Sequence, residues 1–393
     1  MKNKVYRLDE LCDIKSGKRI PKEMDFVTFE TEHPYIRARD IKAGKINTDD
    51  LIYLEDDVFQ KIKRYIINSG DIAITIVGAS VGDTGYASKN VDGYNLTENA
   101  VRLTNYKNNV DSKFLHYVLA QKQYHDYMQL IAGAAAQPKL GIYKVKRIKV
   151  ELPDLKKQKR IVDILSAYDN LIENNNKRIR LLEQTTENLY KEWFVRFRFP
   201  GYEDVEFDGT LPIGWQYQPI SESMDFFDSQ RVPLSSIQRD GMEKIYPYYG
   251  AAKLMDYVDD YLFDGECLLL GEDGTVVTTD GFPILQLVND KFWVNNHAHV
   301  IRGKGNISTR FLYLTFLRFP ITGVVTGSAQ PKISKGRLEK LKILVPDAIT
   351  MEYFNNLINP MFDEINILKK QVIRITKQRD MLLPRLMSGK LEV

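Results

Sequence analysis

The segment Ala136-Gln-Pro-Lys139 recurs 193 residues later as Ala329-Gln-Pro-Lys332 in a chain of 393 residues. The same offset relates Leu152-Pro-Asp154 to Val345-Pro-Asp347. A long apolar stripe follows each copy, with its residues alternately four and three positions apart. The stripes are Ile161, Leu165, Tyr168, Ile172, Asn175, Ile179, Leu182, Thr186, Leu189 and Trp193, then Phe354, Ile358, Met361, Ile365, Leu368, Val372, Ile375, Arg379, Leu382 and Leu386. Because every stripe position corresponds at one offset, the sequence indicates an internal duplication.

The stripes have an average repeat of about 3.5 residues, which is the period of a coiled coil. We therefore expect two long helices that pack antiparallel against each other. Asn175 and Thr186 place polar side chains in the first stripe, where such residues commonly fix the register. Pro360 should kink or restart the second helix, and Pro384 should end it. The alternative is a helical bundle core in which this spacing has no such meaning.

The duplication predicts an α+β fold. We expect two mixed α/β domains separated by the pair of long antiparallel coiled-coil helices, with a pseudo-twofold internal duplication. The first domain should cover residues 1–154 and the first long helix residues 155–198. The second domain should cover residues 199–346 and the second long helix residues 347–393.

The composition is that of a folded globular protein, with 44% hydrophobic and 27% charged residues. No run of about 18 apolar residues predicts a membrane span. The first ten residues lack the apolar core of a secretory signal. Cys12 and Cys267 are the only cysteines, which fits a reducing compartment. We expect a cytoplasmic protein.

The net charge differs between the two modules. Residues 1–150 carry 24 Lys and Arg against 19 Asp and Glu, whereas residues 197–346 carry 15 against 19. Proteins that hold nucleic acid mainly by electrostatics usually have a clearer basic excess. The acidic second module therefore argues against indiscriminate DNA binding, but it leaves room for a local basic face.

Basic residues do recur beside the repeated motif. The pairs at the common offset are Lys139 and Lys332, Lys144 and Arg337, Arg147 and Lys340, and Lys149 and Lys342. Apolar residues alternate with some of them, namely Ile148, Val150 and Leu152, and Leu341, Ile343 and Val345. This period of two predicts a strand with one buried and one basic face. A solvated strand edge protected by lysines is the alternative. Gln137 and Gln330 are better placed for base contacts, because the following proline favours a loop.

Two motifs of DNA-modifying and DNA-cleaving enzymes are missing from the sequence. It contains no Asn/Asp-Pro-Pro-aromatic motif of an amino-methyltransferase and no Glu-x-Lys tripeptide of a common nuclease site. We also expect no serine-nucleophile site. His297 and His299 are the only close-set histidines, without a second ligand cluster, so we predict no metal site. The chain is expected to bind rather than to catalyse.

Several segments together resemble the DNA-specificity (S) subunit of type I restriction–modification systems. They are Leu8–Gly17, Gln158–Leu165, Leu189–Phe194, Leu211–Trp215 and Leu383–Gly389. The resemblance covers nearly the whole chain. It implies that 1–154 and 199–346 are target-recognition domains, each recognising one half of a bipartite site in double-stranded DNA.

The resemblance also implies the partners. The long helices would act as a spacer and as a docking surface for two methyltransferase (modification) subunits, and restriction/translocase subunits would join them. S-adenosylmethionine, ATP and Mg would be bound by the partner subunits, with no cofactor, catalytic residue, metal or membrane contact in this chain.

Two groups of residues are predicted to carry these roles. The DNA-facing group is Lys15, Lys18, Arg19, Arg37, Arg39, Gln137, Lys139, Lys144, Arg147, Arg231, Tyr249, Gln330, Lys332, Arg337 and Lys340. The coiled-coil and partner-binding group is Ile161, Leu165, Ile172, Ile179, Leu182, Leu189, Trp193, Ile358, Ile365, Leu368, Val372, Ile375 and Leu382. One rival hypothesis is a stand-alone DNA methyltransferase or nuclease. The other is a coiled-coil interaction scaffold or RNA-binding protein without DNA sequence specificity.

Overall fold

The computed structural model describes residues 4–134, 136–327 and 330–391. The chain divides into two compact units, which we describe separately. Unit 1 contains residues 1–172 and 374–393, and unit 2 contains residues 173–373. Among the helices in the described ranges, none has the length and apolarity that a bilayer crossing requires.

Two long helices begin at matching aspartates. Helix α6 spans Leu155–Tyr190 and continues as a π-helical turn over Lys191–Val195, and α11 spans Ala348–Met387. An Oδ1 of Asp154 and of Asp347 each accepts a hydrogen bond from the backbone N–H three residues later, at 3.0 Å. A carboxylate here satisfies a free N–H of the first turn and interacts favourably with the helix dipole. The repeated Pro-Asp turn therefore starts both helices.

The stripes form the buried faces of these helices. All twenty stripe positions are buried or half-buried. In unit 2, the side chain of Asn175 donates to Gln371 at 3.1 Å, and Lys369 Nζ lies 2.9 Å from Glu183 Oε1. From the first contact to the second, the residue number increases along α6 and decreases along α11. The two helices are therefore antiparallel in this unit. The predicted antiparallel helix pair is confirmed.

Of the two outcomes predicted for Pro360, a kink or a restart of the second helix, the restart is wrong. Helix α11 runs through Pro360 and also through Pro384, ending three residues later. A proline in a helix removes one N–H donor and crowds a carbonyl of the preceding turn. In unit 2, the Arg310 guanidinium donates to the carbonyl of Asn359 at 2.7 Å and contacts Asp363 at 2.6 Å, which fastens α11 to α9 beside the proline. Burial of the apolar face on both sides of Pro360 stabilises the continuous helix.

Unit 1 is a mixed α/β domain. Its strands are β1 Lys4–Arg7, β2 Asp13–Ser16, β3 Pro34–Ile36, β4 Ile41–Lys42, β5 Gly44–Ile46, β6 Ile52–Tyr53, β7 Ile72–Thr75, β8 Thr84–Tyr86, β9 Asn95–Leu96, β10 Ala100–Thr104 and β11 Lys149–Leu152. Its shorter helices are α1 Leu8–Leu11, α2 Asp56–Ile62, α3 Ser112–Leu119, α4 Lys122–Ala132 and α5 Ile142–Lys146. The sheets have the orders β2-β10-β7-β8-β5-β4, β6-β3-β9 and β1-β11.

Unit 2 has a related set of elements. Its strands are β12 Phe207–Asp208, β13 Leu211–Pro212, β14 Gln216–Pro219, β15 Met224–Phe226, β16 Tyr246–Tyr249, β17 Leu254–Val258, β18 Cys267–Gly271, β19 Leu285–Val288, β20 Trp293–Val294, β21 Ala298–Gly303, β22 Val325–Thr326, β23 Lys332–Ile333 and β24 Lys342–Val345. Its shorter helices are α7 Ile220–Ser223, α8 Ser236–Asp240, α9 Thr309–Phe316 and α10 Lys335–Leu338. The sheets have the orders β15-β21-β18-β19, β17-β16-β20, β14-β24, β22-β23 and β12-β13.

The two units share one strand topology. The antiparallel pair β1-β11 corresponds to β14-β24, and β2-β10-β7 corresponds to β15-β21-β18. In the three-stranded sheets, β3 pairs antiparallel with β6 and parallel with β9, just as β16 pairs with β17 and β20. The predicted duplication is therefore present in the fold. Strand β11 also alternates exposed and buried residues as predicted.

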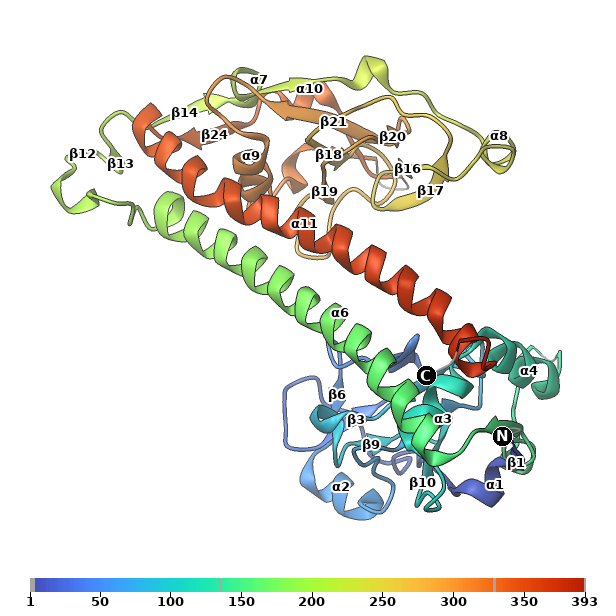
Figure 1. The fold of residues 1–393 in the computed structure, drawn as a ribbon. Helices are drawn as coiled ribbons and strands as arrows, with labels where there is room; N and C mark the ends of the chain where they lie inside the picture. Colours follow the sequence, from blue (N-terminus) through green and yellow to red (C-terminus); the bar gives the residue numbers. More distant parts are fainter. Residues whose placement is uncertain (1–3, 135, 328–329, 392–393) are drawn as a thin grey trace. The chain divides into compact units, whose positions relative to one another are not determined.

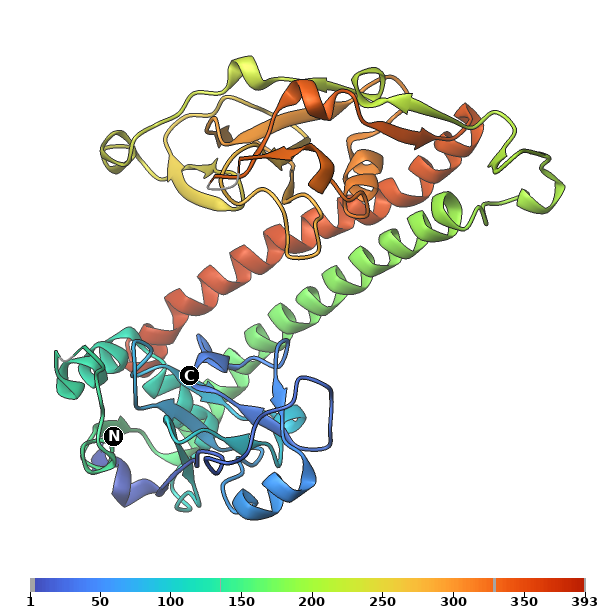
Figure 2. The ribbon, with the colours of Figure 1, turned by 180° about the vertical axis from the view of Figure 1, so that it is seen from behind.

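The long helices contribute to the core of each unit. In unit 1, Leu165 of α6 and Leu386 of α11 share a buried cluster with Phe114 of α3, where green, red and teal helices meet (Figure 1). In unit 2, α9 lies against α11, and the rings of Phe311 and Phe354 meet edge-on with centroids 6.2 Å apart. Figure 2 shows α9 and α11 in the same relation from behind.

Candidate nucleic-acid interface

The two Gln-Pro-Lys loops are held by the same backbone hydrogen bonds. In unit 1, the Gly78 N–H donates to the Pro138 carbonyl at 3.0 Å, and the Leu140 N–H donates to the Ile76 carbonyl at 2.8 Å. We call this pair of bonds the loop brace. It fastens each loop to the end of a buried strand, so that side chains on the loop are presented from a rigid base.

Unit 2 has the equivalent brace. The Gly274 N–H donates to the Pro331 carbonyl at 3.0 Å, and the Ile333 N–H donates to the Glu272 carbonyl at 2.7 Å. Both hydrogen bonds of the brace are therefore present in each unit, although Glu272 in unit 2 occupies the position of Ile76 in unit 1. This equivalence was not visible from the motif alone, because the bracing strands lie far from it in sequence.

The motif side chains are exposed on these loops. Gln137, Lys139, Gln330 and Lys332 are all exposed, as the sequence predicted for groups that contact a partner. The Lys332 ammonium lies 3.4 Å from Glu272 Oε1. Ala329 falls outside the described residues.

Three of the predicted arginines line one cleft in unit 1. Arg19, Arg37 and Arg39 border a cavity of about 590 Å³ that also includes the rings of Phe26 and Tyr35. We call it the arginine cleft. Guanidinium groups beside aromatic rings suit contacts with phosphates and base edges.

Acidic side chains orient these arginines. Arg19 Nε lies 2.6 Å from Glu98 Oε1. Arg37 donates two hydrogen bonds to Asp40, at 2.9 and 3.0 Å. Arg39 pairs with Asp50, and its side chain is 63% exposed. Among the three arginines of the cleft, only Arg19 is more exposed, at 73%.

The other predicted cations of unit 1 lie elsewhere. Lys15 and Lys18 are exposed on and just after β2, and Lys18 Nζ lies 5.8 Å from the Tyr65 ring centre. Arg147 is exposed after α5 and borders a separate cavity. Lys144 differs, because its ammonium donates to the Ile131 carbonyl at 2.6 Å. Its role is therefore partly to anchor α4 to α5.

In unit 2, the prediction for Arg231 needs correction. Its side chain is only 12% exposed, and its guanidinium lies 2.7 Å from Glu272 Oε2 and 2.8 Å from the Ala298 carbonyl. It is bound internally and does not face outward, so we remove it from the DNA-facing group. Tyr249 is half-buried in β16, whereas Arg337 and Lys340 are exposed around α10.

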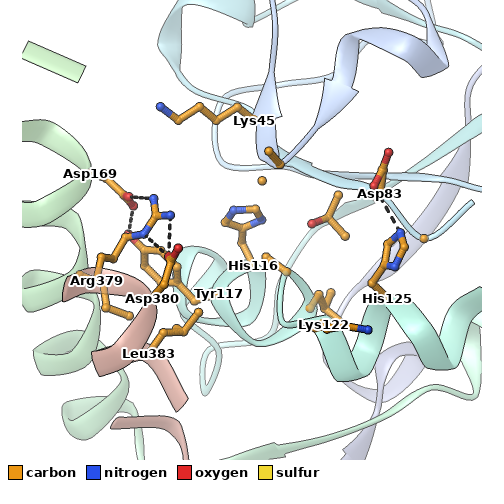
Figure 3. Close-up of a pocket in the computed structure, with 17 residues that line it drawn as sticks. Lys45, Asp83, His116, Tyr117, Lys122, His125, Asp169, Arg379, Asp380 and Leu383 are labelled. Atoms are coloured by element: carbon orange, nitrogen blue, oxygen red, sulfur yellow. Dashed lines mark hydrogen bonds and ion pairs between the residues drawn. The ribbon is translucent and has the colours of Figure 1, made fainter. Parts of the chain in front are cut away.

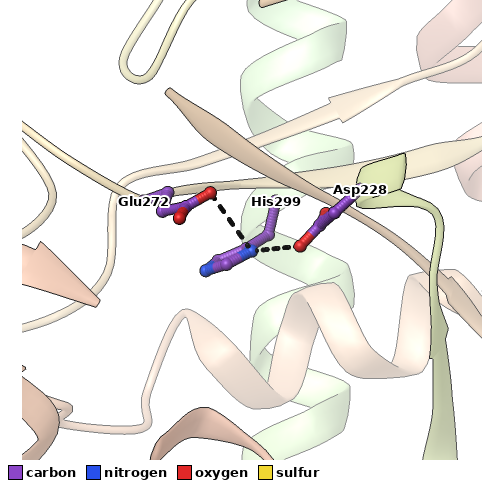
Figure 4. A group of neighbouring side chains, drawn as sticks. All are labelled: Asp228, Glu272 and His299. Atoms are coloured by element: carbon purple, nitrogen blue, oxygen red, sulfur yellow. Dashed lines mark hydrogen bonds and ion pairs between the residues drawn. The ribbon is translucent and has the colours of Figure 1, made fainter. Parts of the chain in front are cut away.

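Arg231 belongs to a buried group of charges that the sequence did not predict. Asp228, Glu272 and His299 place ligand-type atoms within 4.8 Å of one another, and Figure 4 shows the two carboxylates reaching His299. His299 Nδ1 lies 2.6 Å from Asp228 Oδ2, and His299 Nε2 lies 2.8 Å from the Ile333 carbonyl. We call Asp228, Arg231, Glu272 and His299 the buried charge network.

This network fits internal ion pairing better than a metal. The Arg231 guanidinium already supplies a positive charge to Glu272, and both nitrogens of His299 have hydrogen-bond partners. A metal ion would have to displace these contacts. Burial raises the pKa of Asp228, but hydrogen bonds from His299 and from the Val300 N–H outweigh this, so the pKa is lowered overall.

A second polar cavity lies in unit 1 beside the two long helices. Figure 3 shows Arg379 of α11 between Asp169 and Asp380, with Tyr117 beside Asp169 and His116 at the centre. Burial lowers the pKa of His116 to about 4. The neutral imidazole therefore belongs to the core of unit 1, and the sequence showed only an isolated histidine.

The turn after strand β7 contains a serine motif that has a structural role. Gly78-Ala-Ser-Val-Gly82 matches the G-x-S-x-G pattern. In α/β-hydrolases this pattern exposes the hydroxyl of a nucleophilic serine where it joins a strand to a helix. Here it lies between the antiparallel strands β7 and β8, and Gly78 takes part in the loop brace. The context is that of a turn.

The comparison with protein families decides the assignment. The model described as type I restriction modification DNA specificity domain matches residues 1–184 and 212–370. The chain belongs to this family. It is therefore a specificity subunit, which recognises a DNA target and is not itself catalytic.

Individual relatives agree with the family. The chain is 28% identical over 307 residues to the type I restriction enzyme MjaIX specificity subunit of Methanocaldococcus jannaschii, covering 73% of this chain and 71% of the relative. It is 22% identical over 413 residues to the MjaVIII specificity subunit of the same organism, covering 96% and 95%. A crystal structure of the type I restriction-modification S subunit from M. genitalium has a TM-score of 0.63 at 16% identity, covering 98% of this chain and 96% of that one. That likeness shows a shared fold.

Proposed function

We propose that each unit recognises one half of a bipartite target in double-stranded DNA. The recognition domains are residues 1–154 and 199–346, and the spacer helices are residues 155–198 and 347–393. The matching loop braces carry this proposal, because two equivalent loops of one chain are suited to two equivalent positions on a divided site. The exposed Gln and Lys side chains of each loop are the proposed contacts to bases and phosphates.

The two half-sites should differ in sequence. Arg19, Arg37 and Arg39 form the arginine cleft in unit 1, whereas the register of unit 2 places Gly250 at the position of Arg37. Unit 2 also keeps Arg231 in its interior. Different side chains on the same frame favour different base sequences.

The long helices are the proposed spacer and docking surface for two methyltransferase subunits, with restriction subunits joining the assembly. Those partners would bind S-adenosylmethionine, ATP and Mg. The proposed site of action is the cytoplasm, where the target DNA lies.

A domain exchange tests the bipartite model. The chain would be co-expressed with its methyltransferase subunit, and methylated adenines would be mapped across the host genome. Replacing residues 199–346 with those of a relative should change one half of the methylated sequence and leave the other half unchanged. A change in both halves, or in neither, would contradict the model.

The rival scaffold or RNA-binding hypothesis makes a different prediction. The assembled complex should bind a duplex carrying the mapped target at least about a thousandfold more tightly than a scrambled duplex. Equal binding of both duplexes, or preference for RNA of the same sequence, would favour the rival.

A further inference from the structure

The buried charge network is present in unit 2 but absent from unit 1. Strand β15 pairs with β21 in the same way as β2 pairs with β10. This shared register makes Asp228 equivalent to Ser16 and His299 equivalent to Val101. The brace relates Glu272 to Ile76. Unit 1 thus builds the same loop brace without any charge at these positions. The network is therefore not needed to form the brace.

Keeping these charges in unit 2 has a cost. The His299 side chain is 1% exposed, and those of Asp228, Glu272 and Arg231 are 15%, 14% and 12% exposed. The free-energy cost of removing charged groups from water is offset only where their ion pairs have good geometry. Proteins with apolar residues in place of such a network are often equally stable. An expensive network that the fold does not require points to a role in recognition.

The network touches the recognition loop at two points. His299 Nε2 bonds to the Ile333 carbonyl, directly after Lys332. Glu272 Oε1 lies 3.4 Å from the Lys332 ammonium, while Glu272 Oε2 holds Arg231. One carboxylate therefore contacts the proposed DNA-binding lysine and an internal arginine at once.

The arginine also has a counterpart with another orientation. Asp228 and Ser16 occupy equivalent positions, and an arginine follows three residues after each of them, so Arg231 corresponds to Arg19. The Arg19 side chain is 73% exposed in the arginine cleft, whereas that of Arg231 is 12% exposed. The network thus accounts for the difference. Its carboxylates hold the Arg231 guanidinium inward, whereas the equivalent guanidinium of Arg19 lies at the surface of unit 1.

We propose that Glu272 and His299 are positioning residues that set the specificity of the second half-site, by fixing Lys332 and by keeping Arg231 away from the DNA. This inference rests on the proposed function of the two loops. Asp273 and His297 form an ion pair beside the loop and complete the charged surroundings of the network.

Glu272→Gln is the direct test, because it keeps the side-chain shape and removes the charge. The variant chain, assembled with its methyltransferase subunits, would be titrated with duplexes that vary one half-site at a time. We expect discrimination among second half-sites to fall about tenfold, as for the loss of one good base contact, while discrimination among first half-sites stays unchanged. His299→Asn should act in the same direction.

Glu98→Gln provides a matched control. Glu98 is the partner of Arg19 in unit 1, so its substitution should alter discrimination of the first half-site only. The double variant Glu272→Gln with Lys332→Met separates the two contacts of Glu272: the part of the glutamine's effect that passes through the Lys332 ammonium should disappear, and the part that remains should come from Arg231. The thermal midpoint of each variant would be measured alongside to identify loss of folding.

The outcomes separate the two levels of inference. If Lys332→Ala leaves DNA binding unchanged, the proposed function of the loop is wrong. If Lys332→Ala weakens binding but Glu272→Gln leaves second half-site discrimination intact, only the positioning role is overturned. Equal loss at both half-sites in a folded Glu272→Gln variant would also overturn it.

Discussion

Arg379 of α11 donates a hydrogen bond to Asp169 of α6, with Nη1 and Oδ1 2.8 Å apart. The hydroxyl of Tyr117 on α3 donates to the same carboxylate. One aspartate thereby joins three helices of unit 1, including segments more than 200 residues apart in sequence. Arg379 occupies a stripe position that would normally hold an apolar residue, so its charge has to be paired there.

Removing one partner of this pair should destabilise unit 1. We expect Arg379→Met and Asp169→Asn to show a coupling of about 1–3 kcal/mol in a double-mutant cycle measured by chemical denaturation. Arg178 and Glu364 form the matched control, since their side chains are 51% and 41% exposed. That pair should couple by less than about 1 kcal/mol. Equal couplings would show that burial of the Asp169 pair has no energetic effect.

The helix seam can be tested at two neighbouring positions. Leu182 lies half-buried in the seam, while Leu181 is 52% exposed. Leu182→Asp should destabilise unit 2 by several kcal/mol, on the order of 2–5, because it removes apolar contacts and buries a carboxylate. It should also reduce co-purification with the methyltransferase subunit. Leu181→Asp should change the thermal midpoint little, and similar losses from both variants would argue against the seam.

The loop lysines should contribute to the salt dependence of DNA binding. We expect Lys332→Ala to lower the slope of log affinity against log salt by about one unit, as for the loss of one phosphate contact. Lys139→Ala in the equivalent loop should have a similar effect. An unchanged slope for either variant, measured in the assembled complex, would remove that lysine from the interface.

The buried His116 predicts a pH dependence of stability. Its pKa is lowered by burial from 6.5 to about 4, so the unfolded chain binds the extra proton first as the pH falls. Stability should therefore decrease between pH 6.5 and pH 4, by roughly 3 kcal/mol at most, and this loss should level off below pH 4. His116→Leu should flatten the slope in that window. If urea denaturation gives parent and variant the same slope, the assignment is wrong.

Pro360 offers a test of helix strain in unit 2. Pro360→Ala should restore a backbone donor in α11 and raise the free energy of unfolding by about 1–2 kcal/mol, somewhat less than the full helix penalty of proline. Chemical denaturation of the parent and the variant measures this difference. An unchanged or lowered free energy of unfolding in Pro360→Ala would show that the proline does not strain α11.

The periodic features of the fold were predictable from the sequence. The stripes gave the long helices and their buried faces, since a repeat of about 3.5 residues leaves few other structures. Val150 and Leu152 gave the buried face of strand β11, because their alternation with exposed residues has the period of a strand. A restart of the helix at Pro360 was wrongly predicted, because residues on both sides of the proline, such as Ile358 and Phe362, are buried in the core and keep α11 continuous.

The candidate interface was less predictable. The fixed offset of 193 holds from the Gln-Pro-Lys loops onward, but loops of different length change the correspondence upstream. Arg231 therefore matches Arg19, and Tyr249 matches Ile36. The inward turn of Arg231 depends on Glu272, 41 residues away, so no local pattern could reveal it.

The assembly of unit 1 from both ends of the chain has a consequence for synthesis on the ribosome. Leu386 completes a core cluster that begins with Leu8, so the amino-terminal unit cannot close its core until the last helix emerges. Domains usually fold in the order in which they are made. Here the unit translated first is finished last, and a nascent chain stalled before residue 374 would leave the apolar surface around Leu165 uncovered.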